Sequence, residues 1–514
     1  MTATAASVVG SIVSGIVAFV GWNIFKQLYL PDRHKPPVVF HWLPFIGSTV
    51  YYGIDPYKFF FECREKYGDC FTFYLLGSPT TVFLGSKGNE FILNGKIKDL
   101  NAEEVYGPLT TPVFGKGVIY DCPNAKLMDQ KRLLGPGLSG AALKSYVSLF
   151  VKEVEDFIKT SPIFKSDTGI CDISSVMAEI TTYTAAGSLQ GKEIRDMLDS
   201  EISVLYRHLD DGFAPINFVL PWIPIPRNIR RDHAQRAMAK LYMDIIQKRR
   251  KRENPPEEED MLDMLMKSTY RDGNLIPDKE IANLMIALLM GGQHNTSSTG
   301  SWIILHLAHD PSLIEELYQE QLRVLGPTLP PLTYDHLEAL TLHNHMIKET
   351  LRLHSPIHSV MRKVKTPMPV PGTDWVIPPS HTLLSAPSFL GRTPENFPNP
   401  QKWDPHRWDD PKAGFAAMGG GDNSKDDEAT IDYGFGAVSL KSIKSPYLPF
   451  GGGRHRCVAE KYAYTQLGAI LATVVRLLKW EQVDMTKEVP PTDYSSMFSR
   501  PMHPAEIKWK HRGG

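Results

Sequence analysis

The sequence lacks the cysteine patterns that build disulfide frameworks and zinc sites. Its 514 residues include five cysteines, at positions 63, 70, 122, 171 and 457, which are scattered along the chain and odd in number. None belongs to a CxxC pair or to a Cys/His cluster with zinc-ligand spacing. This usage argues against a disulfide-stapled scaffold and suits a reducing compartment.

The sequence also lacks an excess of charge of one sign. It contains no internal repeats and no dinucleotide-binding fingerprint. The net charge of −1 gives no reason to expect a nucleic-acid partner. No glycine pattern typical of a bound flavin or nicotinamide nucleotide is present, so a redox enzyme of this sequence needs electrons from another protein. Hydrophobic residues make up 42% of the chain, enough for one large catalytic domain or for several domains.

Charge is absent from the apolar run 7–25, which is close to the length that crosses a bilayer. No basic segment precedes the run, which argues against a cleaved signal peptide, and the basic flank after it predicts a cytosolic remainder. A buried core helix is the alternative. We expect a membrane anchor over 1–27, a Pro-rich hinge over 28–50 and a catalytic domain over 51–514.

Hydrophobic periodicity predicts a mainly helical chain with a few short strands. The expected helices cover Pro56–Tyr67, Asp278–Ala308, Leu337–Leu353 and Ala459–Leu478; strand-like runs cover Cys70–Leu76, Thr81–Leu84 and parts of Thr366–Ala386. The Gly-, Asp- and Lys-rich stretch Asp410–Ser445 predicts a loosely ordered surface excursion.

The stretch with the clearest chemistry is Phe450–Ala459, which reads FGGGRHRCVA and contains Cys457. Its three glycines can adopt positive φ and let the backbone approach a flat ligand. Arginine and histidine side chains beside Cys457 favour a thiolate, the iron ligand of haem enzymes that cleave dioxygen. The alternative is a Gly-rich surface turn with a free cysteine.

Two further stretches place charged side chains in a recognisable order. Glu349 and Arg352 are spaced to meet on one helix face, and Pro405–Trp408 contributes Arg407. Without the cysteine motif, Glu349 and Arg352 would be interpreted as an ordinary exposed ion pair.

The order and spacing of these motifs resemble the cytochrome P-450 superfamily over nearly the whole chain. The resemblance implies a mostly α (α+β) fold with small β-sheets behind a single N-terminal transmembrane helix. It implies haem b with Cys457 as the axial thiolate ligand of the iron. It also gives Glu349, Arg352 and Arg407 a structural role in holding the haem-binding fold.

The buried helix contains an unusual turn, Gly291–Thr296. A glycine inside a helix costs about 1 kcal/mol relative to alanine, so Gly291 and Gly292 imply either tight packing or a groove over the iron. The polar residues that follow need partners in an apolar helix. A short proton relay formed by His294, Asn295 and Thr296 is the functional interpretation.

The resemblance narrows to the sterol 14α-demethylases on four stretches: Tyr106–Asp121, Gln293–His294, Leu353–Lys363 and Tyr494–Pro501, the last in its fungal form. It implies oxidative removal of the 14α-methyl group of lanosterol- or eburicol-type sterols in three NADPH- and O2-dependent steps, with release of formate. It also implies NADPH-cytochrome P-450 reductase as electron donor, azole-type inhibitors, and a single-pass endoplasmic reticulum membrane protein with a cytosolic catalytic domain.

Carried over residue by residue, the resemblance assigns two groups of side chains. The haem propionates, which are carboxylates and favour charge-assisted donors, would be contacted by Tyr106, Tyr120, Lys131, Arg362 and His455. The sterol channel would be lined by Phe114, Met361 and Met497, for which ordinary core packing is the alternative.

The chain departs from the family pattern at several positions. Asn295 stands where the family usually has threonine, and Gly187 where it usually has arginine. Gly135–Gly137 contains a proline that should end its helix. Arg207–His208 and Ala459 also differ from the residues that the family usually has. These changes favour a diverged paralogue that oxidises a related triterpenoid or confers resistance to demethylase inhibitors. A non-catalytic haem protein that binds sterol or inhibitor is a further alternative.

Overall fold

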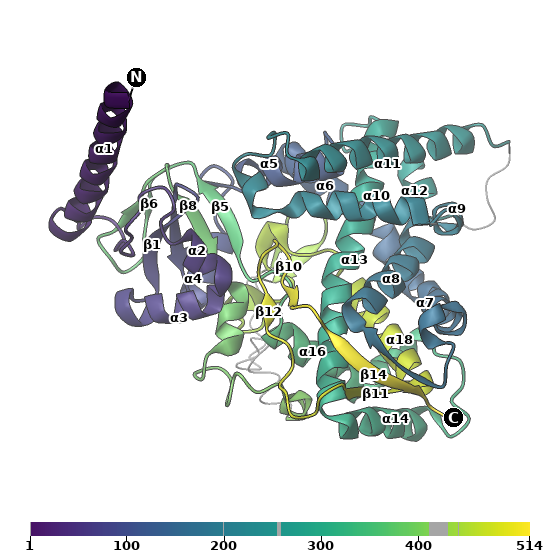
Figure 1. The fold of residues 1–514 in the computed structure, drawn as a ribbon. Helices are drawn as coiled ribbons and strands as arrows, with labels where there is room; N and C mark the ends of the chain where they lie inside the picture. Colours follow the sequence, from purple (N-terminus) through teal and green to yellow (C-terminus); the bar gives the residue numbers. More distant parts are fainter. Residues whose placement is uncertain (1, 199, 254–258, 411–429, 440, 514) are drawn as a thin grey trace. The chain divides into compact units, whose positions relative to one another are not determined.

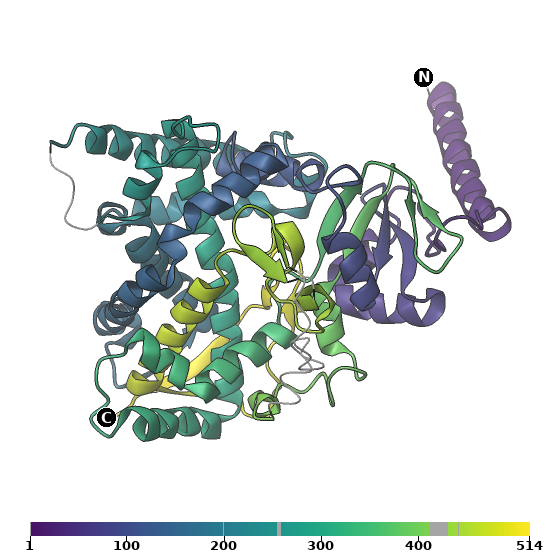
Figure 2. The same ribbon diagram turned by 180° about the vertical axis from the view of Figure 1, so that it is seen from behind.

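The computed structural model describes residues 2–198, 200–253, 259–410, 430–439 and 441–513 (Figure 1; Figure 2 gives the view from behind). The chain forms two compact units. The first contains the chain up to Val105 together with His358–Phe389, and the second contains Tyr106–Ile357 and the chain from Leu390 onward. The expected division into anchor, hinge and catalytic domain follows different boundaries and stays a prediction.

The first unit is built on a five-stranded sheet in the order β1-β2-β8-β5-β3. Strands β1 (Cys70–Leu75) and β2 (Ser78–Phe83) overlap the two predicted strand-like runs and form an antiparallel hairpin. Strand β8 (Thr382–Ser385) pairs parallel to β2 and antiparallel to β5 (Val360–Val364), which in turn pairs with β3 (Leu100–Asn101). The sheet therefore joins two segments of the chain that are far apart in sequence.

Helix α3 (Pro56–Tyr67) confirms its predicted bounds, and its ends show why. The Asp55 carboxylate caps the start by accepting from the Lys58 amide, with Pro56 in the first turn. Gly68, with φ +83°, ends it. This unit also contains α2 (Thr49–Ile54), α4 (Gly85–Leu93) and the hairpin of β6 (Met368–Pro369) and β7 (Val376–Ile377).

The N-terminal helix α1 runs from Thr2 to Tyr29. Near its end, the Gln27 amide accepts from the His41 backbone N–H at 3.0 Å and donates to the His41 carbonyl at 2.9 Å. Among the residues that the structure describes, no helix combines the length and the apolar character needed to cross a membrane. The transmembrane part of the predicted fold stays a prediction.

The second unit is mostly helical and is organised around α13 (Asp278–His309), the long helix labelled near the centre of Figure 1. Residues Ser298–Ala308 of α13 are almost completely buried, as its apolar sequence predicts. Helix α13 packs against α8 (Ile173–Ala185), α11 (Pro226–Arg250) and α16 (Thr341–Leu353), among others.

The other helices that lie wholly in this unit are α6 (Asn124–Leu134), α7 (Gly140–Thr160), α9 (Lys192–Asp196), α10 (Ser200–Asp210), α12 (Met261–Lys267), α14 (Pro311–Leu325), α15 (Tyr334–Ala339) and α18 (Glu460–Leu477). Helix α5 (Glu103–Phe114) begins in the first unit. The small sheets are β11 (Leu478–Gln482), β14 (Glu506–His511) and β4 (Thr168–Asp172), with the hairpins β9–β10 (Thr430–Asp432, Ala437–Ser439) and β12–β13 (Thr492–Asp493, Arg500–Pro501). The predicted mostly helical fold with small β-sheets is confirmed.

Two predicted segments differ from the structure. The helix expected over Leu337–Leu353 is interrupted at Leu340 and forms α15 and α16. In the stretch Asp410–Ser445, residues 411–429 and 440 lie outside the described residues. Most of the rest forms the β9–β10 hairpin and a 3-10 turn (Lys441–Lys444), so this part is not a loosely ordered excursion.

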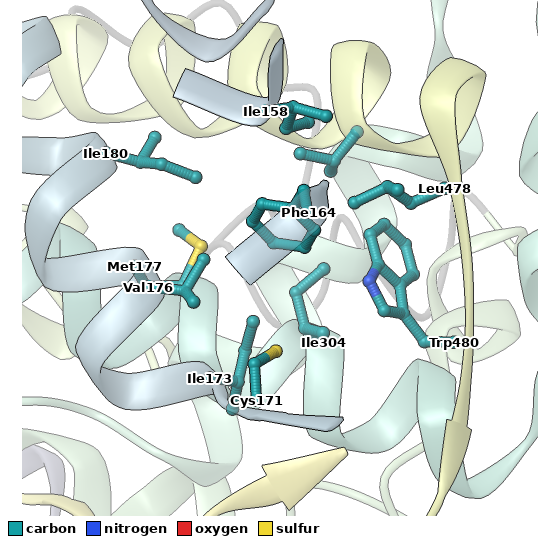
Figure 3. Close-up of a pocket in the computed structure, with 11 residues that line it drawn as sticks. Ile158, Phe164, Cys171, Ile173, Val176, Met177, Ile180, Ile304, Leu478 and Trp480 are labelled. Atoms are coloured by element: carbon teal, nitrogen blue, oxygen red, sulfur yellow. The ribbon is translucent and has the colours of Figure 1, made fainter. Parts of the chain in front are cut away.

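The core around the second half of α13 contains a small cavity of about 10 Å³, room for one water-sized sphere (Figure 3). Every side chain that lines it is apolar, and they come from helices and from the β4–β14–β11 sheet: Ile158, Phe164, Cys171, Ile173, Val176, Met177, Ile180, Ile304, Val474, Leu478 and Trp480. An apolar void of this size is a packing defect with no polar group to bind a ligand.

Candidate functional site

The cysteine loop, Phe450–Ala459, leads directly into α18. Gly451 and Gly453 have φ of +68° and +63°, conformations that glycine adopts without strain. The Cys457 backbone N–H donates to the Phe450 carbonyl at 3.0 Å and closes the loop. The predicted need for flexible glycines is therefore confirmed at two of the three positions.

Cys457 is the exposed cysteine of the chain, whereas the other four are buried. Its thiol touches solvent, yet protein atoms crowd it closely enough that desolvation raises its pKa. The Ala459 amide donates to the sulfur, and this bond and the charges of Lys131 and Arg456 oppose the shift, but desolvation outweighs them and the pKa of Cys457 is raised. An accessible sulfur with an amide donor and nearby cations fits a thiolate metal ligand.

Lys131, on α6, is bound to the cysteine loop. Its Nζ donates to the Arg454 carbonyl at 2.8 Å and to the Arg456 carbonyl at 2.9 Å. The same ammonium lies 4.5 Å from the centre of the Phe435 ring, in the β9–β10 hairpin. Lys131 therefore joins three separate segments beside Cys457.

Two tyrosines and a histidine lie next to this junction. The rings of Tyr106 (α5) and Tyr120 stack with centroids 5.1 Å apart, and Tyr120 lies 6.0 Å from the His455 ring. The structure thus brings together Tyr106, Tyr120 and His455 as a chain of ring contacts that ends in the cysteine loop. Arg362, the fifth predicted propionate ligand, lies on β5 in the first unit, as does Met361.

His294, on α13, lies between aromatic rings. Its Nε2 is 3.3 Å from Asp210 Oδ1 at the end of α10, but the geometry does not make a hydrogen bond. Phe498 stacks on it at 5.1 Å and Tyr206 at 5.9 Å. Burial lowers the pKa of His294, opposed by the Asp210 charge. The imidazole is therefore neutral near pH 7.

The two residues after His294 differ in what the structure shows of them. Asn295 Oδ1 is buried and has no hydrogen-bond partner in the part of the chain that the structure describes. Thr296 is 4% exposed. Buried polar groups are normally paired, so an orphan carbonyl oxygen here calls for a bound water or a ligand.

Phe114 and Met497 both contact the large apolar cluster around the first half of α13. Phe114 also packs on Phe213, with ring centroids 5.8 Å apart. Sequence reasoning did not assign a role to Asp210, Tyr206 or Phe498. Only a weak sequence signal could have pointed to Asp210. It is a carboxylate at the C-terminus of a helix, where the helix dipole disfavours negative charge.

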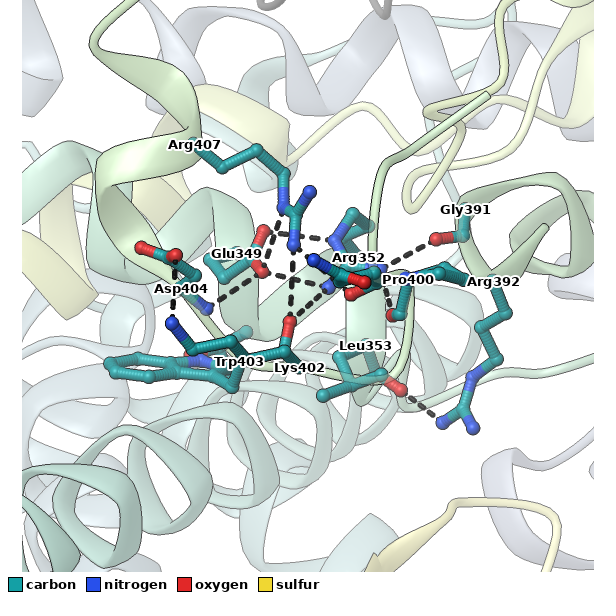
Figure 4. A network of polar contacts seen from close by, with 12 residues as sticks. Glu349, Arg352, Leu353, Gly391, Arg392, Pro400, Lys402, Trp403, Asp404 and Arg407 are labelled. Atoms are coloured by element: carbon teal, nitrogen blue, oxygen red, sulfur yellow. Dashed lines mark hydrogen bonds and ion pairs between the residues drawn. The ribbon is translucent and has the colours of Figure 1, made fainter. Parts of the chain in front are cut away.

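Glu349 and Arg352 form a fully buried pair rather than the exposed pair that spacing alone suggests (Figure 4). Arg352 Nη2 and Nε bind the two carboxylate oxygens at 2.7 and 2.9 Å. Arg407 Nε and Trp408 Nε1 donate to the same carboxylate at 3.2 and 3.0 Å, as does the Asp404 amide at 2.9 Å. Every donor and acceptor of the pair has partners.

The other side of Arg352 binds backbone carbonyls. Its Nη1 donates to Gly391 and Pro400, both at 2.6 Å, and its Nη2 donates to Lys402 at 3.1 Å (Figure 4). The network therefore fastens the segment 391–408 to α16. This geometry is that of a scaffold, with no free polar atom for chemistry.

The departures at positions 135 and 187 have local explanations. Helix α6 ends at Leu134 and Pro136 begins a 3-10 turn, as the proline predicts. A Cβ at Gly187 would lie 3.5 Å from Glu153 Oε1. Arg195 already binds both oxygens of Glu153, at 2.9 and 2.6 Å. The carboxylate beside position 187 is therefore paired without an arginine there.

Residues 36–509 match the family described as Cytochrome P450. The chain is 61% identical to "Sterol 14-alpha demethylase CYP51C" of Gibberella zeae, over 97% of this chain and 95% of that protein. It is 54% identical to "Sterol 14-alpha demethylase cyp51A" of Aspergillus fumigatus, over 98% of this chain and 96% of that protein.

Among solved structures, the retinoic acid-bound cyanobacterial CYP120A1 is similar in fold, with a TM-score of 0.73 at 19% identity, covering 94% of this chain and all of that one. The match to the family over most of the chain, with relatives more than half identical along nearly their full length, settles the classification. The chain belongs to the cytochrome P450 family, within its sterol 14α-demethylases.

Proposed function

We infer that this chain is a sterol 14α-demethylase, a monooxygenase that removes the 14α-methyl group of lanosterol- or eburicol-type sterols. The reaction takes three NADPH- and O2-dependent steps and releases formate. The observation that carries this conclusion is 54–61% identity, over at least 97% of this chain, to proteins named sterol 14-alpha demethylase.

Membership of the P450 family implies a thiolate-ligated haem, and we assign the axial ligand to Cys457. The bound haem supplies dioxygen activation. Support comes from the accessible sulfur and its amide donor. The propionates would be held by Tyr106, Tyr120, Lys131, Arg362 and His455. Lys131 supports this assignment by its position, because its Nζ is bound to the Arg454 and Arg456 carbonyls of the cysteine loop and so places a cation beside Cys457.

Proton delivery is assigned to His294, Asn295 and Thr296. The neutral His294 imidazole can take up a proton that solvent delivers at the partly exposed Asp210 side chain, and can release it toward the reacting oxygen. The orphan Asn295 Oδ1 accepts a hydrogen bond from a water that takes the place of the family's threonine hydroxyl. Phe114, Met361 and Met497 would form apolar walls for the sterol.

The partners follow from the same assignment. The sterol is the substrate, NADPH-cytochrome P-450 reductase would supply electrons, and azole-type inhibitors would bind the same site. We also propose that α1 anchors the protein in the endoplasmic reticulum membrane, based on its uncharged run 7–25. Microsomes that express the full chain should retain it after alkaline carbonate extraction, whereas a chain without residues 1–27 should be released.

The second candidate is a diverged paralogue with the same chemistry on a related triterpenoid, or with a role in resistance to demethylase inhibitors. One observation favours it: Asn295 leaves a buried oxygen without a partner in the described structure. No comparable observation favours the non-catalytic haem protein.

The decisive experiment reconstitutes the full chain with reductase, NADPH and 24-methylenedihydrolanosterol. We expect a 14-demethylated diene and one formate per sterol, identified by mass spectrometry. NADPH consumption that yields only peroxide would contradict the proposed function. The same assay on Asn295→Thr tests the assigned proton route: we expect a severalfold lower peroxide yield per NADPH. A large gain in turnover from a nearly inactive wild type would instead support the binding-protein alternative.

A further inference from the structure

Two aromatic rings are stacked on the His294 imidazole. Phe498 lies at 5.1 Å with an interplanar angle of 17°, and Tyr206 lies at 5.9 Å with an angle of 25°. Phe213 meets the imidazole edge-on at 6.3 Å. Rotation of the imidazole about its Cβ–Cγ bond would break both stacked contacts and would move Nε2 away from Asp210 Oδ1, which is 3.3 Å away.

The turn that carries Phe498 is held by the residue that follows it. Ser499 is 3% exposed, and all of its polar groups are bonded. Its N–H donates to the Pro356 carbonyl at 2.8 Å, and its hydroxyl donates to the Ser355 carbonyl at 2.7 Å. Its carbonyl accepts from Ser298 Oγ at 2.7 Å. Phe498 is therefore fixed by bonds on its C-terminal side.

Both stacking rings are fastened to α13, the helix that carries His294. Ser298 lies four residues after His294, on the same helix face, and holds the Phe498 turn. On the other side, the Tyr206 hydroxyl donates to the Leu289 carbonyl of α13 at 3.2 Å. The imidazole and the two rings are thus linked to one rigid element.

We propose that Phe498, held by the Ser298–Ser499 hydrogen bond, is a positioning residue that keeps the His294 imidazole directed at Asp210. This inference deepens the proposed function and rests on it, because the orientation matters only if His294 delivers protons to the demethylation reaction. Phe498 contacts no reacting atom in this assignment, and Tyr206 provides the second stacked ring.

The first test compares Phe498→Leu, which removes the flat ring, with Phe498→Tyr, which keeps it. In resting protein labelled with [15N]histidine, the His294 signal is assigned by its loss in His294→Gln. We expect Phe498→Leu to raise the pKa of His294 toward its ordinary value, because water reaches the ring, and Phe498→Tyr to leave it as in wild type. In turnover, Phe498→Leu should lower kcat several-fold and raise peroxide per NADPH, with KM changed less than twofold.

The second test uses two neighbouring serines of α13. Ser298→Ala removes the bond to the Phe498 turn, whereas Ser297 Oγ donates to the His294 carbonyl within its own helix at 3.1 Å, so Ser297→Ala is the matched control. We expect Ser298→Ala to reproduce part of the Phe498→Leu effect on coupling. Ser297→Ala should behave like wild type.

An effect of Phe498→Leu on KM alone, with unchanged His294 titration and coupling, would overturn the proposal and make Phe498 a channel residue. An equal effect of Ser297→Ala and Ser298→Ala would also overturn it. If wild type yields no demethylated sterol, the proposed function fails, whereas the His294 titration in resting protein still decides whether Phe498 positions the ring.

Discussion

Two groups of buried polar residues in the second unit differ in how well they are paired. Around Glu349 and Arg352, the carboxylate and the guanidinium are 0% exposed and bonded on all sides. Around His294, the Nε2 atom and the Asn295 and Gln293 side-chain oxygens have no hydrogen-bond partner in the described residues. Full pairing is typical of a scaffold, whereas unpaired buried groups mark a place where a substrate, cofactor or water binds.

The largest effect is expected from breaking the fully paired network. Glu349→Ala leaves the buried Arg352 charge without its carboxylate, which should cost about 3–5 kcal/mol of unfolding free energy. The exposed pair Lys152–Asp156 provides the control, since Lys152→Ala should leave the free energy of unfolding nearly unchanged. Urea unfolding, with haem content as a second readout, measures both; equal losses would contradict the scaffold role.

The unpaired group should show the opposite pattern, with little change in stability and a large change in activity. His294→Gln should lower turnover about 100-fold or more, because a positioned acid–base group contributes that much. The melting temperature should stay near that of wild type. His309→Gln, at the other end of α13 beside Gln482, should leave turnover unchanged. A melting temperature that falls in step with activity would show that His294 is structural.

A third group, the pair His306 and His354, shares a hydrogen bond that fails when both rings are protonated. Their Nε2 atoms are 2.9 Å apart, and each ring stacks on a tryptophan, His354 on Trp302 and His306 on Trp403. Burial lowers the pKa of His306 to about 3 and the pKa of His354 well below its ordinary value. Both folded values lie below the unfolded value, so the pair stabilises the protein above about pH 6.5.

That stability is lost as the pH falls from about 6.5 toward 3, because the unfolded chain binds the protons first. The proton uptake linked to His306 alone should lower the free energy of unfolding by about 2 kcal/mol between pH 6.5 and 5. Denaturant unfolding at both pH values measures this, and His306→Gln should flatten the dependence. The control is His406→Gln, which removes an exposed ring whose pKa is raised by Asp409. A wild-type profile flat down to pH 5 would refute the assignment.

The smallest effect concerns the apolar cavity of Figure 3, where packing is incomplete but no polar atom is left unpaired. Val176→Ile adds one methylene to the cavity and should stabilise the fold by about 0.8 kcal/mol. Val154→Ile, at a buried position that does not line the cavity, should destabilise by about 1 kcal/mol through overpacking. Thermal melting compares the two, and equal shifts would mean that the cavity cannot admit the methylene.

Elements with strong local signals were predictable from the sequence. Helix α3 has its own cap and stop residues, β1 and β2 lie in strand-like runs, and α13 contains the apolar segment Leu284–Met290. The break at Leu340 was not predictable, because its cause is tertiary. Glu320, on α14, accepts hydrogen bonds from the Leu342 and His343 amides and so starts α16 there.

The candidate site also has one part that could be predicted from the sequence and one part that could not. The cysteine loop is a contiguous motif, so its glycines and Cys457 could be identified directly. The environment of His294 is assembled from α10, α13 and the turn before β13, and no local pattern links Tyr206 to Phe498. Contacts between distant segments depend on the packing of the whole unit, which periodicity does not encode.

The pairing of Glu153 with Arg195 decides which substitutions the present chain can tolerate at these positions. The Glu153 carboxylate is largely buried, and leaving a buried charged group without its partner costs about 1–3 kcal/mol or more. The carboxylate beside position 187 therefore needs no arginine there in this chain. Arg195 is the residue whose loss would leave Glu153 buried without its partner.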